Sequence, residues 1–470
     1  MARPCSARSG ARHRLCANIA SIGLAVGIVL AADAHAQISE IPKGGGANGE
    51  STVRKGQGWD AAVTPQSSPT RTPAPAAPAT PPNARPAAAN ASQSIVSAAE
   101  IGVTGSVTKL TLTITAPADY QVFALPDPFR IIVDLPHVTV QLPTSAGRQA
   151  RGIITAFRFG VFAADRSRIV IDTDGPVKVR HAMQSTGDAK APRRLVIELE
   201  PSDRENFLAA LPQPANDQRN AIFEDKVVWP KLATSKPVIV IDPGHGGLDP
   251  GAVTAGDVQE KDVVLAVAKQ LESALFASGR YEVRLTRAND VFVALNQRVA
   301  TSVAAQSNLF ISLHADSIAD AAFAQTARGA AVYTLSDRAS NRAAQLSADK
   351  ENAVDALAGV ENVSSDGDDQ VKSILFDLMK RETQMFSNDF RGLVIDRMRQ
   401  VTPLAREPGR SAAFKVLQQS HAPSVLIELG FLSNPNDAKQ LTSEAWQRQV
   451  AQSIAGAVDA YFAKTAAKSP

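Results

Sequence analysis

The sequence predicts a small all-β sandwich domain followed by an α/β domain with a mixed, mostly parallel sheet flanked by helices. A chain of 470 residues is too long for one ordinary hydrophobic core. Short alternating apolar runs separated by turn residues fill 95–200, which is typical of β-strands. From residue 236 onward strand patterns alternate with helix patterns, and this order favours parallel pairing within an α/β layer fold.

Residues 1–36 have the parts of a secretory signal peptide. Four arginines form a basic front, 19–32 is apolar, and Ala-His-Ala at 34–36 is a small-residue cleavage site. The apolar part is short for a membrane span, and nothing after it looks like a stop-transfer segment. An uncleaved anchor is the alternative. We expect cleavage, and no integral membrane segment in the mature protein.

The composition of the mature chain excludes two properties. Both cysteines, Cys5 and Cys16, lie in the removable segment, so we expect no disulfide. Four Arg and one Asp are removed from 49 basic and 46 acidic residues, so both counts become 45. A chain without net charge gives no electrostatic reason to expect nucleic acid as a partner.

Two segments are expected to connect folded parts. Residues 37–94 are rich in Pro and Ala and contain hardly any large apolar side chain, so they cannot offset their ordering entropy. We expect a disordered tether there, extended and partly polyproline II. A second, polar connection over 201–235 contains Pro212, Pro214 and Pro230.

A repeated pattern supports the sandwich at 95–200. The segments 129–134, 167–172 and 194–198 each carry a basic residue, three apolar residues and an acidic residue. Repeated strand units of this kind fit a small β-sandwich. The arrangement resembles the AMIN domain, a module of periplasmic proteins that binds the cell wall or localises an enzyme on it.

The second domain, 236–463, is predicted as strands and helices in turn. The closing helix has an apolar stripe, which is expected in the core. The expected strands are 237–241, 281–286, 308–314, 329–335 and 424–429, and the expected helices are 260–275, 293–305 and 443–462.

Two histidines directly follow apolar strands. His245 comes after 238–241 in a turn rich in Gly and Pro, and His314 comes after 309–313. Ligands gather at the strand ends of an open α/β sheet. Either histidine alone is compatible with a packed or solvent-facing residue, but two of them together are better explained as metal ligands.

A carboxylate completes this candidate site. Glu260 opens the helix after the His245 loop. Two imidazoles and one carboxylate, with an open position for water, form a known catalytic zinc pattern. The alternative is a first-turn glutamate favoured by the helix dipole.

Glu428 is anomalous because it lies inside an apolar strand pattern, 425–431. An unpartnered buried carboxylate is costly, so this residue should be paired, protonated or close to a cation. A carboxylate beside a zinc-bound water is the general base that metal-assisted hydrolysis requires. A structural salt bridge is the alternative.

Five blocks in order resemble the signatures of zinc-dependent N-acetylmuramoyl-L-alanine amidases of the third family type. The resemblance covers about 236–463. It implies that His245, Glu260 and His314 bind one Zn²⁺ and that Glu428 is the catalytic glutamate. The blocks are IDPGHGGLDPGA at 241–252, EKD at 260–262, TR at 286–287 with Asp290 and Arg298, SLHAD at 312–316 and IELGFLSN at 427–434.

The implied reaction is hydrolysis of the amide between N-acetylmuramic acid and L-alanine of peptidoglycan stem peptides by a zinc-activated water. Arg287 and Arg298 lie on elements flanking the His314 strand. They either pair with Asp290 or contact stem-peptide carboxylates, and the structural role is favoured.

The segment 337–400 is longer than a connection requires, and long insertions beside an active site are commonly lids or regulatory elements. In the cell-separation subgroup of these amidases, such an insertion is similar to an autoinhibitory helix that covers the zinc and is displaced by an activator protein. We hypothesise that Glu351 supplies an oxygen to the resting zinc. A solvated helix face is the alternative. The apolar face at 371–379 is a candidate activator-docking surface, or else a core stripe.

The favoured function is therefore a periplasmic zinc amidase for septal cell-wall splitting and daughter-cell separation. A non-catalytic peptidoglycan-binding scaffold is one alternative, although it has no use for Glu428. A zinc carboxypeptidase on the same substrate is another, and it differs only in the bond that is cut.

Overall fold

The computed structural model describes residues 94–184, 192–211, 236–317, 327–360 and 370–467. The expected signal peptide, the expected tether up to residue 93, and residues 212–235 of the expected connection 201–235 lie outside these residues. The described chain contains the strand-rich region and the sheet with helices that the sequence predicts.

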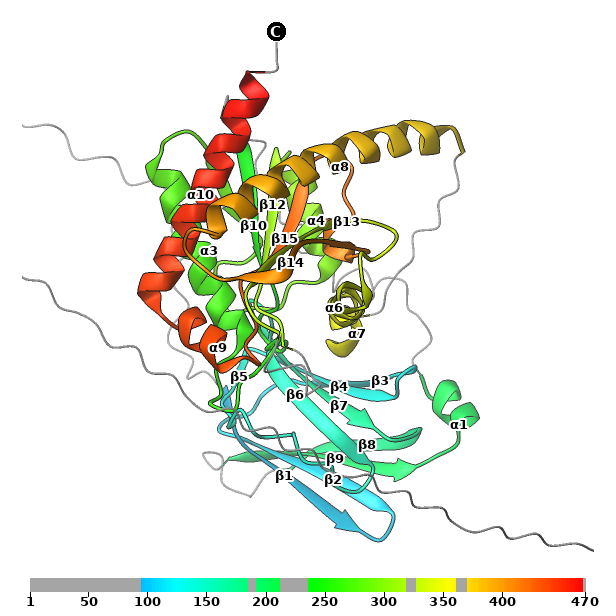
Figure 1. The fold of residues 1–470 in the computed structure, drawn as a ribbon. Coiled ribbons are helices and arrows are strands. Elements are labelled where there is room, and N and C mark those ends of the chain that lie inside the picture. The colour runs from blue at the N-terminus through cyan, green and yellow to red at the C-terminus, as the bar shows by residue number, and fades with distance from the viewer. Residues whose placement is uncertain (1–93, 185–191, 212–235, 318–326, 361–369, 468–470) are drawn as a thin grey trace, which may run out of the picture. The chain divides into compact units, whose positions relative to one another are not determined.

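Six strands form the sheet of the α/β domain, in the order β11-β10-β12-β15-β13-β14 (Figure 1). Neighbouring strands are parallel except β13 and β15, so β13 and β14 run against the other four. The strands are β10 (Val238–Pro243), β11 (Glu282–Leu285), β12 (Leu309–His314), β13 (Ala330–Leu335), β14 (Leu404–Ala412) and β15 (Ser424–Glu428).

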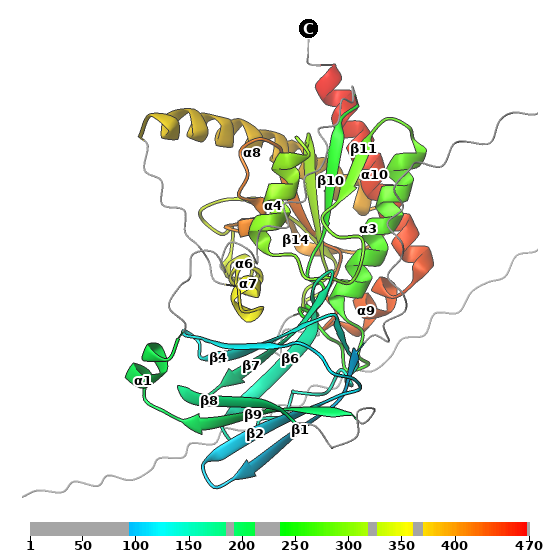
Figure 2. The ribbon, with the colours of Figure 1, turned by 180° about the vertical axis from the view of Figure 1, so that it is seen from behind.

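Helices cover both faces of this sheet (Figures 1 and 2). One face packs against α3 (Glu260–Ala277), α8 (Gln370–Met398) and α10 (Glu444–Ala466). The other packs against α4 (Leu295–Ala304) and α6 (Arg342–Asn352). The apolar stripe of α10 is buried in the first of these cores, as predicted, and α9 (Pro435–Leu441) precedes it. Among the described helices, none combines the length and apolar character needed to cross a bilayer.

The insertion is more divided than the sequence suggests. Its first part contains two helices, α6 and α7 (Val354–Leu357). The last turns of α8 enter the main core through Phe390, Val394 and Met398. This end of α8 therefore belongs to the domain core. The side chains of the apolar face expected at 371–379 lie outside the described part of the chain.

The N-terminal region is a β-sandwich. Its two sheets, β5-β1-β2-β9-β8 and β3-β4-β7-β6, enclose one apolar core, and the short helix α1 (Arg204–Ala209) follows. The strands are β1 (Ser94–Thr104), β2 (Val107–Ile114), β3 (Gln121–Leu125), β4 (Arg130–Pro136), β5 (Val138–Val140), β6 (Ile154–Ala163), β7 (Arg166–Thr173), β8 (Val177–Gln184) and β9 (Arg193–Pro201).

Two of the three copies of the repeated sequence pattern pair with each other in one sheet. β4 and β7 pair antiparallel, so the acid that ends one copy, Asp134, lies opposite the base that begins the next, Arg168. The two side chains are buried and form a bidentate pair at 2.6 and 2.8 Å. The third copy lies in β9, in the other sheet. The acids of the other two copies also form cross-strand ion pairs, Asp172 with Arg158 of β6 and Glu198 with Lys109 of β2.

Candidate metal centre

The metal-ligand candidates meet where two neighbouring strands end. β10 ends at Pro243, which is in register with Leu313 of β12, so the turn carrying His245 lies beside His314. Gly244 makes this approach possible, because a Cβ at that position would lie 2.4 Å from Nε2 of His314. His245 has a positive φ of 57°, as tight turns often require.

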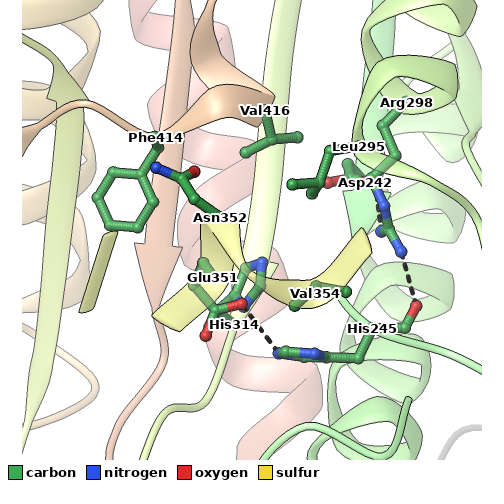
Figure 3. Close-up of a pocket in the computed structure, with 10 residues that line it drawn as sticks. All are labelled: Asp242, His245, Leu295, Arg298, His314, Glu351, Asn352, Val354, Phe414 and Val416. Atoms are coloured by element: carbon green, nitrogen blue, oxygen red, sulfur yellow. Dashed lines mark hydrogen bonds and ion pairs between the residues drawn. The ribbon is translucent and has the colours of Figure 1, made fainter. Parts of the chain in front are cut away.

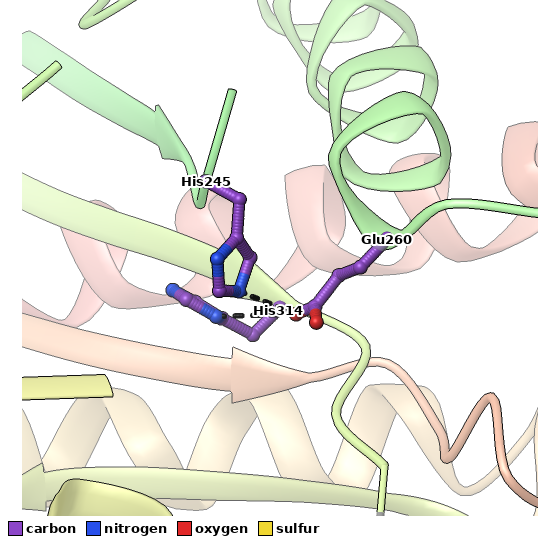
Figure 4. A group of neighbouring side chains, drawn as sticks. All are labelled: His245, Glu260 and His314. Carbon is purple, nitrogen blue, oxygen red and sulfur yellow. Dashed lines mark ion pairs between the residues drawn. The ribbon is translucent and has the colours of Figure 1, made fainter. Parts of the chain in front are cut away.

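Glu260 completes a compact group with the two histidines (Figure 4). Its Oε1 lies 3.1 Å from Nε2 of His245 and 3.2 Å from Nδ1 of His314. All three side chains are buried, and Glu260 has no exposed surface. Glu260 is the first residue of α3. It therefore lies in the first helical turn and also contacts both histidines.

Further contacts orient these side chains. Nδ1 of His245 is 2.7 Å from Oδ2 of Asp249, which leaves Nε2 as the free ring nitrogen. Glu260 accepts backbone N–H bonds from Ala252 at Oε2 and Ala315 at Oε1, both at 2.8 Å. A carboxylate that fixes the ring orientation of a ligand histidine is a common feature of metal sites. No role for Asp249 was inferred from the sequence, although it lies within the 241–252 block.

The ring nitrogens that face the group fit a cation. Nε2 of His245 and Nδ1 of His314 are buried and have no hydrogen-bond partner. Buried polar atoms are seldom left without a partner. An imidazole nitrogen that carries no proton can bind a metal ion. The donor set of two imidazoles and one carboxylate therefore fits a bound metal ion.

Charges stabilise the ionised form of Glu260. Burial by itself opposes ionisation, but the charge of His245 and the contacts with both histidines outweigh it and hold the pKa of Glu260 well below its usual range. A carboxylate that stays ionised at neutral pH is the form that binds a cation.

Glu428 lies beside this group at the end of β15, opposite His314. It is fully buried. Its Oε2 accepts the N–H of Asp316 at 3.0 Å, and its Oε1 has no hydrogen-bond partner. Burial, with the negative charges of Asp316 and Glu260, raises the pKa of Glu428 well above its usual range. Among the described residues no lysine or arginine forms an ion pair with it, so a structural salt bridge does not account for its burial.

Glu351 of α6 also reaches the centre (Figure 3). It is only 4% exposed, so it does not lie on a solvated helix face. Its Oε2 is 3.3 Å from Nε2 of His245 and 3.4 Å from Nδ1 of His314. Burial raises the pKa of Glu351, although the neighbouring histidines and Lys350 oppose the shift.

The two arginines hold the backbone of the His245 turn. Arg287 donates to the carbonyls of Pro243 at 2.9 Å and Gly244 at 2.7 Å. Arg298 donates to the carbonyl of His245 at 2.8 Å and pairs with the buried Asp242 at 2.8 Å. Both side chains are buried. Their contacts are therefore structural, and they are made mainly with carbonyls and Asp242.

A strand-end group of metal ligands with an unpaired buried glutamate beside it is the arrangement of a metal-dependent hydrolase. The model of the N-acetylmuramoyl-L-alanine amidase family matches residues 239–460, and the AMIN domain model matches 100–199. AmiC of Neisseria meningitidis, an N-acetylmuramoyl-L-alanine amidase, is 34% identical over 384 residues, which cover 78% of this chain and 89% of that protein. The chain belongs to the N-acetylmuramoyl-L-alanine amidase family and carries an AMIN domain before the amidase domain.

Two further relatives have the same family name. AmiC of Escherichia coli is 32% identical over 388 residues, covering 79% of this chain and 91% of that protein. AmiA of the same species is 36% identical over 265 residues, covering 54% of this chain and 89% of that protein. The similarity to AmiA is therefore confined to a smaller part of this chain.

Replacement of His245 by Ala should abolish stoichiometric metal binding, because it removes one of the two unpartnered imidazole nitrogens. Elemental analysis of the purified full-length chain measures this. His181→Ala, an exposed histidine of β8, is the control and should keep the wild-type metal content. A fully loaded His245→Ala protein would contradict the assignment of the centre.

Replacement of Arg298 by Met should destabilise the α/β domain by about 3–5 kcal/mol, because it leaves the buried Asp242 carboxylate without its cation. Urea unfolding followed by circular dichroism measures the change. Arg280→Met is the control, since Arg280 pairs with Asp459 with a side chain that is 56% exposed, and it should have little effect. Equal stability of the two variants would show that the Arg298 network is not structural.

Proposed function

We propose that this protein hydrolyses the amide between N-acetylmuramic acid and L-alanine in peptidoglycan, with one Zn²⁺ held by His245, Glu260 and His314. The observation that carries the proposal is the convergence of two free imidazole nitrogens and a Glu260 oxygen beside the unpaired Glu428 oxygen. Membership of the amidase family supports the choice of bond.

The spacing of the ligand atoms supports zinc. Ligands about 2.0–2.1 Å from a tetrahedral zinc ion lie about 3.3 Å from one another. Oε1 of Glu260 lies 3.1 and 3.2 Å from the two imidazole nitrogens, and Oε2 of Glu351 lies 3.3 and 3.4 Å from the same atoms. Two nitrogens and two carboxylate oxygens are also a donor set that suits zinc.

Glu428 is proposed as the general base and acid. When bound, zinc polarises the scissile carbonyl and lowers the pKa of a water molecule toward neutrality. Oε1 of Glu428 has no protein partner and is free to accept a proton from that water, while the Asp316 N–H holds Oε2 in place. Glu428 then passes the proton to the leaving amine.

Glu351 is proposed as an autoinhibitory ligand. Its Oε2 lies 3.3 and 3.4 Å from the two ligand nitrogens, so it would compete with water for a zinc ion held there and inhibit the resting enzyme while α6 stays in place. An activator protein would release α6 by docking on the insertion at about 337–400. This role gives a reason for a buried glutamate on a helix whose composition is otherwise polar.

The remaining parts of the chain are proposed to deliver the enzyme to its substrate. Residues 1–36 would be a cleavable signal peptide for export to the periplasm, and 37–94 a tether. The AMIN domain, about 95–200, would localise the amidase domain, 236–463, through the linker 201–235. Such an enzyme would act in septal wall splitting and daughter-cell separation, consistent with its AmiC relatives.

Digestion of purified sacculi should release free stem peptides with an N-terminal L-alanine. A chelator should stop the reaction, and Glu428→Gln should lower the rate by about 10²–10⁴-fold while keeping the metal. Mass spectrometry of the soluble products identifies the bond. Shortened peptides still joined to sugar would indicate a carboxypeptidase. No products from either the wild-type chain or Glu351→Ala would indicate a binding scaffold.

Replacement of Glu351 by Ala should raise the activity measured without an activator by at least about tenfold. This is the change expected when the binding of α6 to the centre is weakened by about 1.4 kcal/mol. Asp349→Ala is the matched control, because Asp349 is an exposed carboxylate on the same helix. Release of dye from labelled sacculi measures the rate. A Glu351→Ala rate no higher than wild type would refute autoinhibition by this residue.

A further inference from the structure

α6 brings an ammonium as well as a carboxylate into the centre. Lys350 precedes Glu351, and its Nζ lies 2.5 Å from Oδ1 of Asp316. The same Nζ is 3.6 Å from Oε1 of Glu351. One dipeptide of the insertion therefore sets a carboxylate against the metal-ligand nitrogens and an ammonium against Asp316, next to each other.

The reaction of the proposed function produces the same two groups in the same relation. The C–N bond of the amide breaks, and the carbonyl carbon receives the oxygen of water and becomes a carboxylate. The nitrogen keeps the electron pair of that bond, and both protons of the water end on it. One of them passes through Glu428, so the products are a carboxylate and the α-ammonium of an L-alanyl peptide.

We propose that Asp316 binds the α-ammonium of the departing L-alanyl peptide, and that Lys350 and Glu351 inhibit the resting enzyme by occupying the positions of the two product charges. This inference rests on the proposed function. It assigns a substrate contact to Asp316, and it makes the insertion a mimic of the products rather than a simple cover.

The surroundings of Asp316 support this role. Its backbone N–H binds Oε2 of Glu428 at 3.0 Å, so its carboxylate is held beside the group that protonates the amine. The carboxylate is buried, with the residue 5% exposed. Two of its partners belong to α6, namely Nζ of Lys350 and the Ser347 hydroxyl, which donates to Oδ2 at 3.0 Å.

Displacement of α6 removes both of these partners together. Of the donors to its side chain within the described residues, Asp316 then keeps the N–H of Ser317, at 2.6 Å. A largely buried carboxylate that has lost its cation is a strong site for another one. An ammonium is the matching ligand because hydrogen bonds between two ions are the strongest kind available there.

Peptide binding tests the proposal without turnover. The binding partner for these peptides is the full-length, zinc-loaded chain with Glu351→Ala and Glu428→Gln. The first change weakens the attachment of α6 to the centre, and the second blocks hydrolysis. The probes are L-alanyl-γ-D-glutamate and its N-acetylated form, which lacks the ammonium. Calorimetry should give at least about tenfold tighter binding of the free amine. Asp316→Asn, which keeps the size and the backbone N–H, should abolish this preference.

A second variant tests the mimicry from the side of the lid. Lys350→Met in the otherwise wild-type chain empties the ammonium position, so the free-amine dipeptide should bind at least about tenfold tighter than to wild type. Lys464→Met is the matched control, because Lys464 forms an ion pair with Asp389 away from the centre, and it should leave binding unchanged.

Equal affinity for the two dipeptides, in a chain that keeps its zinc and its folded circular dichroism spectrum, would overturn the proposal and leave the Lys350–Asp316 pair as a lid contact alone. The outcome is separable from that of the proposed function. The bond that is cut is read from the products of sacculus digestion, whereas the Asp316 site is read from binding by an inactive chain.

Discussion

The buried negative charge of the metal centre is the constraint on which the rest of the site depends. Glu260, Glu351 and Glu428 are all buried, and an isolated carboxylate in an apolar interior costs several kcal/mol. Backbone donors satisfy both oxygens of Glu260, but Oε1 of Glu351 and Oε1 of Glu428 accept no hydrogen bond. Positive charge has to stabilise these carboxylates instead. Lys350 of α6 supplies part of that charge, and a metal ion among the ligand nitrogens would supply the rest. The docking of α6 and the binding of metal are therefore linked.

The backbone that carries His245 is held by buried hydrogen bonds. The turn that carries His245 contains backbone conformations that few residues adopt, with φ of 57° at His245 and 126° at Gly246. Arg287 and Arg298 bind the carbonyls of this turn, and Arg298 is itself held by Asp242. The buried pair of Arg298 and Asp242 therefore helps to fix the position of His245. Either arginine would have to break these hydrogen bonds before its side chain could contact the substrate.

The sequence identified the parts of the site that interrupt a regular pattern. His245 and His314 follow largely apolar strands, and Glu428 ends a strand within an apolar run of sequence, so each stands out against its neighbours. Asp316 and Asp249 could not be assigned a role in this way, since an acid after a strand or in a turn is common. The α6 partners of Asp316 lie 31 and 34 residues further along the chain. Strand β14 was missed for a related reason, because Leu404–Ala412 is a polar edge strand with no apolar run.

The packing of α6 explains why the sequence left two interpretations open for Glu351. α6 has a single large apolar side chain, Leu346, and that side chain is 58% exposed. Its buried face consists of Ala344, Ser347, Ala348 and Glu351. Because hydrophobic stabilisation scales with apolar area, at about 25 cal/mol per Å², two alanines hold the helix only weakly. The attachment of α6 therefore depends on its polar contacts at the centre and on bonds of Asn352 to Ala413 and Lys415 at 2.8 Å. A helix held in this manner loses most of its binding when the charged contacts are broken, which suits an element that has to leave the site before substrate can enter.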